Sequence, residues 1–280
     1  MDTKALLREF EIRPLKGLGQ NFLVDRGVLQ RILETAEVGP QDVVLEVGAG
    51  LGILTRALAE RVRRVIAVEV DQLLVTVLRE QLSTFANCEV VLGDILELDI
   101  AELVRTADAG PAPRYKVVAN IPYYITSAVL RRILEQDHKP ELVVLMVQNE
   151  VAKRIVAEPG EMSLLSVSVQ FYGRPSFIAR VPARCFHPIP KVDSAILRID
   201  VHEQLPLPRD SIGPFFDVVR AGFGQRRKQL HNALARGLHL PVERISEPLA
   251  WAGIDGRRRA ETLSVGEWVA LCQALYMPAT

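Results

Sequence analysis

Apolar residues along this chain fall into short, almost continuous runs that are separated by polar turns and helical patterns. Five of these runs lie at residues 43–47, 64–68, 88–92, 117–119 and 142–147. Runs of this length between helical patterns are typical of strands that are buried on both faces of a parallel sheet. The alternation of strand and helix from Val43 to about Ile155 therefore predicts a parallel sheet with helices on both sides.

Two further strands, and then only helices, are predicted after this region. Segments 176–181 and 194–199 follow a helical stretch at 164–171 and are the expected final pair, which gives seven strands with a closing hairpin. Segment 202–208 contains two prolines and interrupts any regular element. We therefore expect an α/β domain at residues 1–203 and a small all-helical domain at residues 204–280.

A glycine-rich loop follows the first predicted strand. Residues 46–52 read E-V-G-A-G-L-G and lead into a helix-like stretch. Nucleotide-like ligands lie against backbone N–H groups in such a strand–turn–helix setting. The dinucleotide pattern G-x-G-x-x-G would need a glycine at Ile53, whereas E-x-G-x-G-x-G resembles motif I of the S-adenosylmethionine-dependent methyltransferases. Glycines such as Gly48 and Gly50 then let the backbone approach the cofactor without a Cβ in the way.

Acidic side chains end the next two predicted strands. Glu69 can accept hydrogen bonds from both hydroxyls of a ribose, as acids do at this place in nucleotide-binding folds. Asp94 follows the third strand, where a carboxylate can accept from the amino group of an adenine. Each acid alone also fits a solvated carboxylate at a strand end. Together they favour a cofactor site on a Rossmann-like, seven-stranded class I S-adenosylmethionine methyltransferase sheet.

The fourth predicted strand ends in the sequence Asn-Ile-Pro-Tyr at residues 120–123. The side-chain oxygen of Asn120 and the carbonyl of Ile121 can both accept from an amino group, and Pro122 offers no competing N–H. Tyr123 provides a ring face for stacking. A strand end followed by a proline turn is the alternative for these four residues alone. With the upstream sites, the segment indicates a pocket for a flat, amine-bearing ring.

The composition limits the class of protein. The 280 residues are 49% hydrophobic, and no apolar stretch approaches the ~20 residues of a membrane span. The N-terminus lacks the apolar core of a signal peptide. Three widely separated cysteines, Cys88, Cys185 and Cys272, fit a reducing cytoplasm without disulfides, and neither they nor the five histidines have metal-ligand spacing. We expect a cytoplasmic protein without a membrane partner and without a metal site.

Positive and negative charges balance over the whole chain, but they are distributed unevenly along its length. The 34 basic and 34 acidic residues cancel, whereas residues 174–280 carry 15 basic and 10 acidic side chains. The stretch from Arg220 to Arg236 holds five basic residues and no acid, including Arg226, Arg227 and Lys228. A helix with such a basic face is expected to bind RNA phosphates; a solvated basic helix is the alternative.

Several strings together resemble the rRNA adenine N6,N6-dimethyltransferase family, from about Leu18 to Leu275. They are G-Q-N-F-L at 19–23, E-V-G-A-G-L-G at 46–52, G-D at 93–94, N-I-P-Y at 120–123, F-H-P-I-P-K-V-D-S at 186–194 and F-G-Q-R-R-K-Q-L at 223–230. The P-K-V-D-S and Q-R-R-K segments and R-A-E-T-L-S at 259–264 are most similar to the small-subunit branch of that family.

The resemblance implies an activity and a set of site residues. That branch dimethylates two adjacent adenosines near the 3′ end of small-subunit (16S) rRNA, with S-adenosyl-L-methionine as methyl donor. The expected partner is this rRNA within a pre-ribosomal 30S particle, and we expect a monomer. The resemblance places the cofactor against Asn21, Leu23, Gly48, Gly50, Glu69, Asp94 and Asn120.

Around the target base, the resemblance implies Asn120, Tyr123 and Phe186, with Phe186 as a second aromatic wall. Without the resemblance, Phe186 would be assigned to the core. Residues 19–23 would be assigned to a helix cap and a buried ring. The base must leave its stack to enter such a pocket. The residues would then act by positioning and by electrostatic orientation of the amine.

Two other functions remain open at this point. The first is the large-subunit rRNA methyltransferase branch of macrolide resistance, which shares the N-terminal motifs but usually has a shorter tail than the roughly 75 residues present here. The second is a ribosome-assembly or RNA-binding factor in which methylation is secondary. Mass spectrometry of small-subunit rRNA and binding by a catalytically inactive variant would separate these alternatives.

Overall fold

The computed structural model describes residues 3–105, 114–225 and 227–276, which belong to two compact units. The first unit comprises residues 1–152 and 175–201, and the second comprises residues 153–174 and 202–280. The contiguous domains expected from the sequence differ from these units in the segment 153–174 and at residues 202–203. Which part of the chain carries which function stays a prediction.

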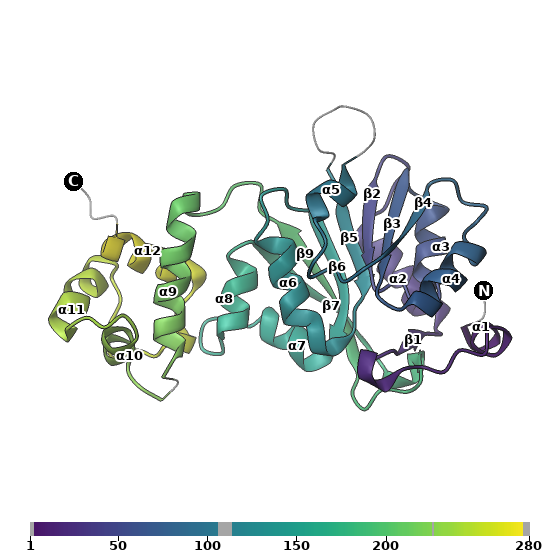
Figure 1. Ribbon diagram of the computed structural model, residues 1–280. Helices are drawn as coiled ribbons and strands as arrows, with labels where there is room; N and C mark the ends of the chain where they lie inside the picture. The colour runs from purple at the N-terminus through teal and green to yellow at the C-terminus, as the bar shows by residue number, and fades with distance from the viewer. Residues whose placement is uncertain (1–2, 106–113, 226, 277–280) are drawn as a thin grey trace. The chain divides into compact units, whose positions relative to one another are not determined.

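The first unit is built on the predicted seven-stranded sheet, which is shown in Figure 1. Its strands are β2 (Val43–Val47), β3 (Arg64–Glu69), β4 (Cys88–Leu92), β5 (Lys116–Asn120), β6 (Leu142–Gln148), β7 (Gly173–Val181) and β9 (Ser194–Val201). They lie in the order β4-β3-β2-β5-β6-β9-β7. The five strands from β2 to β6 are parallel to their neighbours, and β9 is antiparallel to β6.

Helices connect these strands and bury both faces of the sheet. The helices of the first unit are α1 (Thr3–Glu9), α2 (Arg26–Ala36), α3 (Ile53–Ala59), α4 (Gln72–Gln81), α5 (Ile100–Val104), α6 (Thr126–Leu134) and the start of α7 (Asn149–Ile155), whereas α8 (Leu164–Gln170) belongs to the second unit. One hydrophobic cluster joins α2, α3 and α4 to alternate strand residues such as Val44, Val65 and Val144. Figure 1 shows α5 and α6 on the opposite side of the sheet. Burial on both faces explains why these strands are apolar at nearly every position.

The strand order determines where a ligand can bind. The chain moves from β2 through β3 to β4 at one edge, and then returns to β5 and continues outward through β6 on the other side of β2. Connections on either side of β2 and β5 therefore run in opposite directions, which opens a crevice beyond the carboxyl ends of these strands. Ligands of doubly wound sheets bind in such a crevice.

A small ribbon that the sequence did not predict lies beside this crevice. Strand β1 (Phe22–Leu23) pairs with β8 (Phe186–His187), so that Leu23 lies opposite Phe186. The Thr3 hydroxyl donates to the Leu23 carbonyl over 2.7 Å and ties α1 to the ribbon. A cluster that includes Leu6, Phe22, Leu51 and Leu74 packs the N-terminal segment onto the first unit.

The C-terminal part of the second unit consists of helices α9 (Ile212–Phe223), α10 (Leu230–Gly237), α11 (Val242–Trp251) and α12 (Val265–Tyr276). Helices α9 and α10 approach closely at Gly237, where a Cβ would lie 2.5 Å from the Cβ of Ala221. The Trp268 side chain is fully buried over Gly222. Within the described residues, no helix is both long and apolar enough to cross a membrane.

Candidate active site

A cavity of about 420 Å³ occupies the crevice in the first unit. It is lined by the ends of β2, β3 and β5, by the loop after β4, and by residues 18–23 of the N-terminal segment. The size is within the range of small-molecule and cofactor sites. The cavity brings together eight residues that the sequence analysis selected: Asn21, Leu23, Gly48, Gly50, Glu69, Asp94, Asn120 and Tyr123. Their individual roles stay predictions.

The glycine-rich loop follows β2 with a left-handed backbone. Gly48, Gly50 and Gly52 have φ angles of +71°, +60° and +78°, which side chains with a Cβ rarely adopt. A Cβ at Gly50 would lie 3.2 Å from the Phe22 ring of the N-terminal segment. Gly48 and Gly50 line the cavity, whereas a Cβ at Gly52 would lie 2.9 Å from Leu78. The first two glycines keep the cavity open, and the third allows α3 to pack against α4.

The backbone holds the Glu69 carboxylate in a fixed position at the end of β3. One oxygen accepts from the N–H of Gly50 at 2.8 Å, and the other accepts from the N–H groups of Val70 and Asp71 at 2.9 and 3.0 Å. Burial raises the pKa of this carboxyl group, and the three N–H donors oppose that shift. A carboxylate has about four acceptor sites, so Glu69 retains capacity for a ligand hydroxyl.

Glu46 is a buried acid that the sequence analysis did not select as a site residue. It lies in β2, is 2% exposed, and lines the cavity. Its Oε2 has no hydrogen-bond partner among the described residues, and burial raises its pKa to about 8. A lone acid within an otherwise apolar strand was the signal in the sequence that could have identified it.

The third acid of the cavity, Asp94, is exposed. Its Oδ1 accepts from the backbone N–H of Leu96 over 2.9 Å, which fixes the side chain at the end of β4. No Lys, Arg or His is among the described residues that line the cavity. The cavity therefore combines three carboxyl groups with an apolar wall. Glu46, whose pKa of about 8 keeps it protonated at neutral pH, would ionise beside a ligand that carries positive charge.

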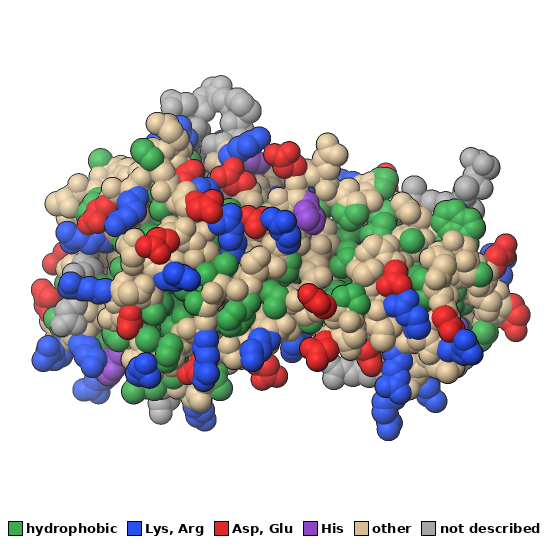
Figure 2. Space-filling view, turned by 180° about the vertical axis from the view of Figure 1, so that it is seen from behind, with side chains coloured by type: hydrophobic (Ala, Val, Ile, Leu, Met, Phe, Trp, Pro, Cys, Tyr) green, Lys and Arg blue, Asp and Glu red, His purple; other side chains and the backbone are tan. Residues whose placement is uncertain are grey.

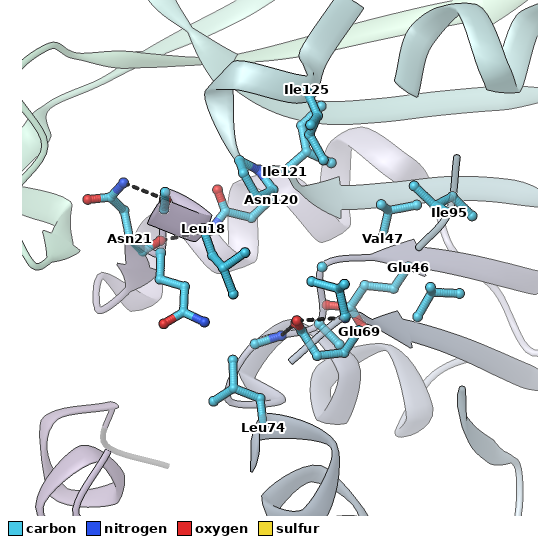
Figure 3. A pocket seen from close by; sticks show the side chains of 18 of the residues that line it. Leu18, Asn21, Glu46, Val47, Glu69, Leu74, Ile95, Asn120, Ile121 and Ile125 are labelled. Atoms are coloured by element: carbon cyan, nitrogen blue, oxygen red, sulfur yellow. Dashed lines mark hydrogen bonds between the residues drawn. The ribbon is translucent and has the colours of Figure 1, made fainter. Parts of the chain in front are cut away.

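Asn120 ends β5 and faces the N-terminal segment, as Figure 3 shows. Its Nδ2 donates to the backbone carbonyl of Asn21 over 3.3 Å. The Asn21 side chain in turn donates to the carbonyl of Gly19 over 2.9 Å. Because its amino group is engaged in this way, the Oδ1 of Asn120 is the part of the amide that remains for a donor in the cavity.

Tyr123 begins a single 3₁₀ turn, η2 (Tyr123–Ile125), and its ring is half-buried. The phenol oxygen lies 2.6 Å from the Ser194 hydroxyl oxygen, and the Tyr123 carbonyl accepts from the Thr126 hydroxyl over 3.0 Å. Burial raises the pKa of the phenol, and the hydrogen bond with Ser194 opposes that shift. One side of the ring therefore borders the cavity while its tip and backbone are held.

Phe186 is not among the residues that line the cavity. Its side chain is 2% exposed and belongs to the core cluster that includes α2, α3 and α4. This is the position expected from the alternative assignment of Phe186 to the core. Its role as a second wall of the base pocket stays a prediction, and the pairing of Phe186 with Leu23 places its backbone next to a cavity residue.

The expectation of one helix across the basic stretch is wrong. Helix α9 ends at Phe223 and α10 begins at Leu230, and Arg227 and Lys228 lie in the exposed connection between them. The intervening residues offer no apolar stripe that would bury a helix face. Arg226 lies outside the described residues. Figure 2 shows basic side chains at the lower edge of the second unit, and Figure 1 draws the connection between α9 and α10 at the same edge.

Comparisons with known proteins agree with this geometry. The family described as ribosomal RNA adenine dimethylase matches residues 14–276. A ribosomal RNA small subunit methyltransferase A from Dehalococcoides mccartyi is 49% identical, over 96% of this chain and 91% of its own length. The protein of the same name from Moorella thermoacetica is 44% identical, over 98% of this chain and 96% of its own length.

A solved structure supports the fold. The crystal structure of the 23S rRNA methyltransferase ErmE is 33% identical, with a TM-score of 0.71 over 91% of this chain and 99% of that chain. The seven-stranded methyltransferase fold with a helical C-terminal region is thus confirmed.

Proposed function

The chain belongs to the ribosomal RNA adenine dimethylase family, and we propose that it transfers methyl groups from S-adenosylmethionine to the N6 amines of adenosines in small-subunit rRNA. The observation that carries the proposal is the cavity at the ends of β2 and β5, which joins the glycine-rich loop, three acids and the Asn120–Tyr123 segment. Names of relatives at 44–49% identity favour the small subunit over the large-subunit activity of the 33% identical ErmE.

The cavity fits S-adenosylmethionine in size and charge. The cofactor carries a sulfonium, an ammonium and a carboxylate group with a net positive charge, and the cavity presents three carboxyl groups without a basic side chain among its described lining residues. The partnerless oxygen of Glu46 in particular needs a donor or a cation. Gly48 and Gly50 would admit the cofactor, and Asn21, Leu23, Glu69, Asp94 and Asn120 would hold it. When bound, the cofactor supplies an electrophilic methyl group.

Asn120 and Ile121 would orient the target amine. The Oδ1 of Asn120 and the carbonyl of Ile121 accept its hydrogens, which directs the nitrogen lone pair toward the methyl group. The hydrogen bond from Nδ2 of Asn120 to Asn21 keeps Oδ1 available for this. No strong base is needed before transfer, because the amine becomes acidic only when it has accepted the methyl group. The contribution of the protein is positioning and electrostatic orientation.

The adenosine would leave its stack and lie against Tyr123, a contact worth about 1–3 kcal/mol per stacked base. Phe186 is proposed as the second wall on the strength of the family resemblance, and the pairing of its backbone with the cavity residue Leu23 supports this role. Arg226, Arg227 and Lys228 would contact rRNA phosphates, and the exposure of Arg227 and Lys228 supports this role.

We further propose that the substrate is two adjacent adenosines near the 3′ end of 16S rRNA in a pre-ribosomal 30S particle. The protein would act on it in the cytoplasm as a monomer.

One experiment tests the proposal directly. Purified protein and S-adenosylmethionine are incubated with small ribosomal subunits that lack adenosine methylation, and the RNA is analysed by mass spectrometry. The expected product is N6,N6-dimethyladenosine at two adjacent positions, with a sharply lower yield in the reaction of Tyr123→Ala. A parallel reaction with large ribosomal subunits is the comparison, and methylation of large-subunit RNA alone would refute the assignment in favour of the other branch. Binding of subunits without methylation by the wild type would favour an assembly factor.

A further inference from the structure

Ser194 is a buried residue whose hydroxyl group none of the assignments above explains. It is 0% exposed and begins β9, where it lies opposite Gln148 of β6. Its oxygen lies 2.6 Å from the phenol oxygen of Tyr123, either atom being the possible donor. No other hydrogen bond of the Ser194 hydroxyl is found within the described residues. The buried serine and the half-buried tyrosine therefore satisfy each other.

The strand around Ser194 is itself firmly held. The carbonyl of the preceding residue, Asp193, accepts from the N–H of Asn149 over 3.0 Å, and its carboxylate accepts from the N–H of Ala183 over 2.8 Å. Arg180 forms an ion pair with the same carboxylate. Ser194 thus presents its hydroxyl group from a fixed point of the central sheet.

Packing alone does not fix the Tyr123 ring, because one side of it borders a cavity of about 420 Å³. Without a constraint at its tip, the ring could turn into that space about its side-chain torsions. The hydrogen bond with Ser194 provides this constraint, and the bond from Thr126 to the Tyr123 carbonyl fixes the other end. A phenylalanine would offer a similar face for stacking but no group for Ser194 to hold.

We propose that Ser194 is a positioning residue for methyl transfer, which acts by holding the Tyr123 ring in the orientation that stacks on the target base. The inference rests on the proposed function, because it assigns the ring to the adenosine. Ser194 is not among the described residues that line the cavity. Its effect should appear in the rate of the transfer step and not in cofactor affinity.

A double-mutant cycle tests the inference with Ser194→Ala, Tyr123→Phe and the double variant. We expect Ser194→Ala to lower the single-turnover rate of adenosine methylation about tenfold, which corresponds to about 1.4 kcal/mol, with unchanged S-adenosylmethionine affinity. In the Tyr123→Phe background, the same substitution should have no further effect, because the hydrogen bond is already absent. The double variant should also be more stable than either single variant, since it leaves no orphaned hydroxyl.

Ser166→Ala is the matched control. Ser166 is also a fully buried serine, but it lies in α8 of the second unit, where its hydroxyl accepts from the N–H of the N-cap residue Ser163 and donates to the Arg154 carbonyl, each over 2.8 Å. Its loss should lower the melting temperature without any coupling to Tyr123→Phe. Wild-type methylation by Ser194→Ala, or an equal rate loss in both backgrounds, would overturn the inference and leave the proposed function intact. A wild-type protein that fails to methylate rRNA would overturn both.

Discussion

The buried carboxyl group of Glu46 makes the stability of the protein depend on pH in a direction opposite to that of ordinary acids. Its pKa of about 8 in the folded chain lies above the value of 4.5 for an unfolded glutamate. Between these values the folded state keeps a proton that the unfolded chain releases. The free energy of unfolding should therefore fall as pH rises through this window.

The size of the effect follows from the shift. A single proton changes the free energy of unfolding by about 1.36 kcal/mol per pH unit where the two states differ fully in protonation. From pH 5 to pH 7, the contribution of Glu46 should thus fall by roughly 3 kcal/mol. In Glu46→Gln, which keeps the shape and removes the proton equilibrium, this component should be absent.

Urea denaturation of the cofactor-free protein at pH 5, 6, 7 and 8 measures how the free energy of unfolding changes with pH. The slope of this dependence is compared between the wild type and Glu46→Gln. Glu97→Gln is the control, because this glutamate is exposed. Saturating S-adenosylmethionine should flatten the wild-type slope, since a bound cation favours the ionised carboxylate. Parallel pH curves for wild type and Glu46→Gln would refute the reasoning.

Three further substitutions test the remaining assignments. Glu69→Ala leaves three backbone N–H groups without their acceptor and removes the partner of the ribose, so calorimetry should show a loss of about 1.5–3 kcal/mol in S-adenosylmethionine binding. Unchanged affinity in a folded variant would exclude the assignment. Tyr123→Ala should abolish most methyl transfer at nearly normal cofactor affinity, and a parallel loss of both would place the ring in the cofactor site. Neutralising Arg226, Arg227 and Lys228 together should lower the slope of log affinity for rRNA against log salt by about 0.9 per lost phosphate contact on a duplex; an unchanged slope would leave these residues as ordinary surface charges.

The sheet could be predicted because its strands are buried on both faces. Runs such as Val43–Val47 and Leu142–Gln148 are apolar at every position except Glu46 and Gln148, which is typical of buried parallel strands between helices. The acids and Asn120 could be predicted as one site because parallel strands end at the same edge. Residues at the ends of successive strands in the sequence therefore lie close together in the structure.

Other features of the structure have no comparable signal in the sequence. The ribbon of β1 and β8 consists of two residues in each strand, which is too short for any periodicity. The contact between Ser194 and Tyr123 joins residues 71 positions apart, and nothing in the local pattern of either segment indicates it. Helix α1 is also stabilised by tertiary contacts, among them the bond from Thr3 to Leu23. The run of basic residues gave the wrong expectation of one helix across the connection between α9 and α10, because charge does not supply the buried face that a helix needs.

The pairing of β1 with β8 also has a consequence for the order of folding. Next to this ribbon, Asp25 and Cys185 interact across 160 positions of the chain, and contacts of such long range form late because their loop-closure entropy must be overcome first. The wall of the cavity that residues 18–23 supply is therefore incomplete until residue 187 has left the ribosome. A growing chain should acquire affinity for the methyl donor only after residue 187 has emerged, well after the strands that carry the glycine-rich loop and Glu69 have appeared.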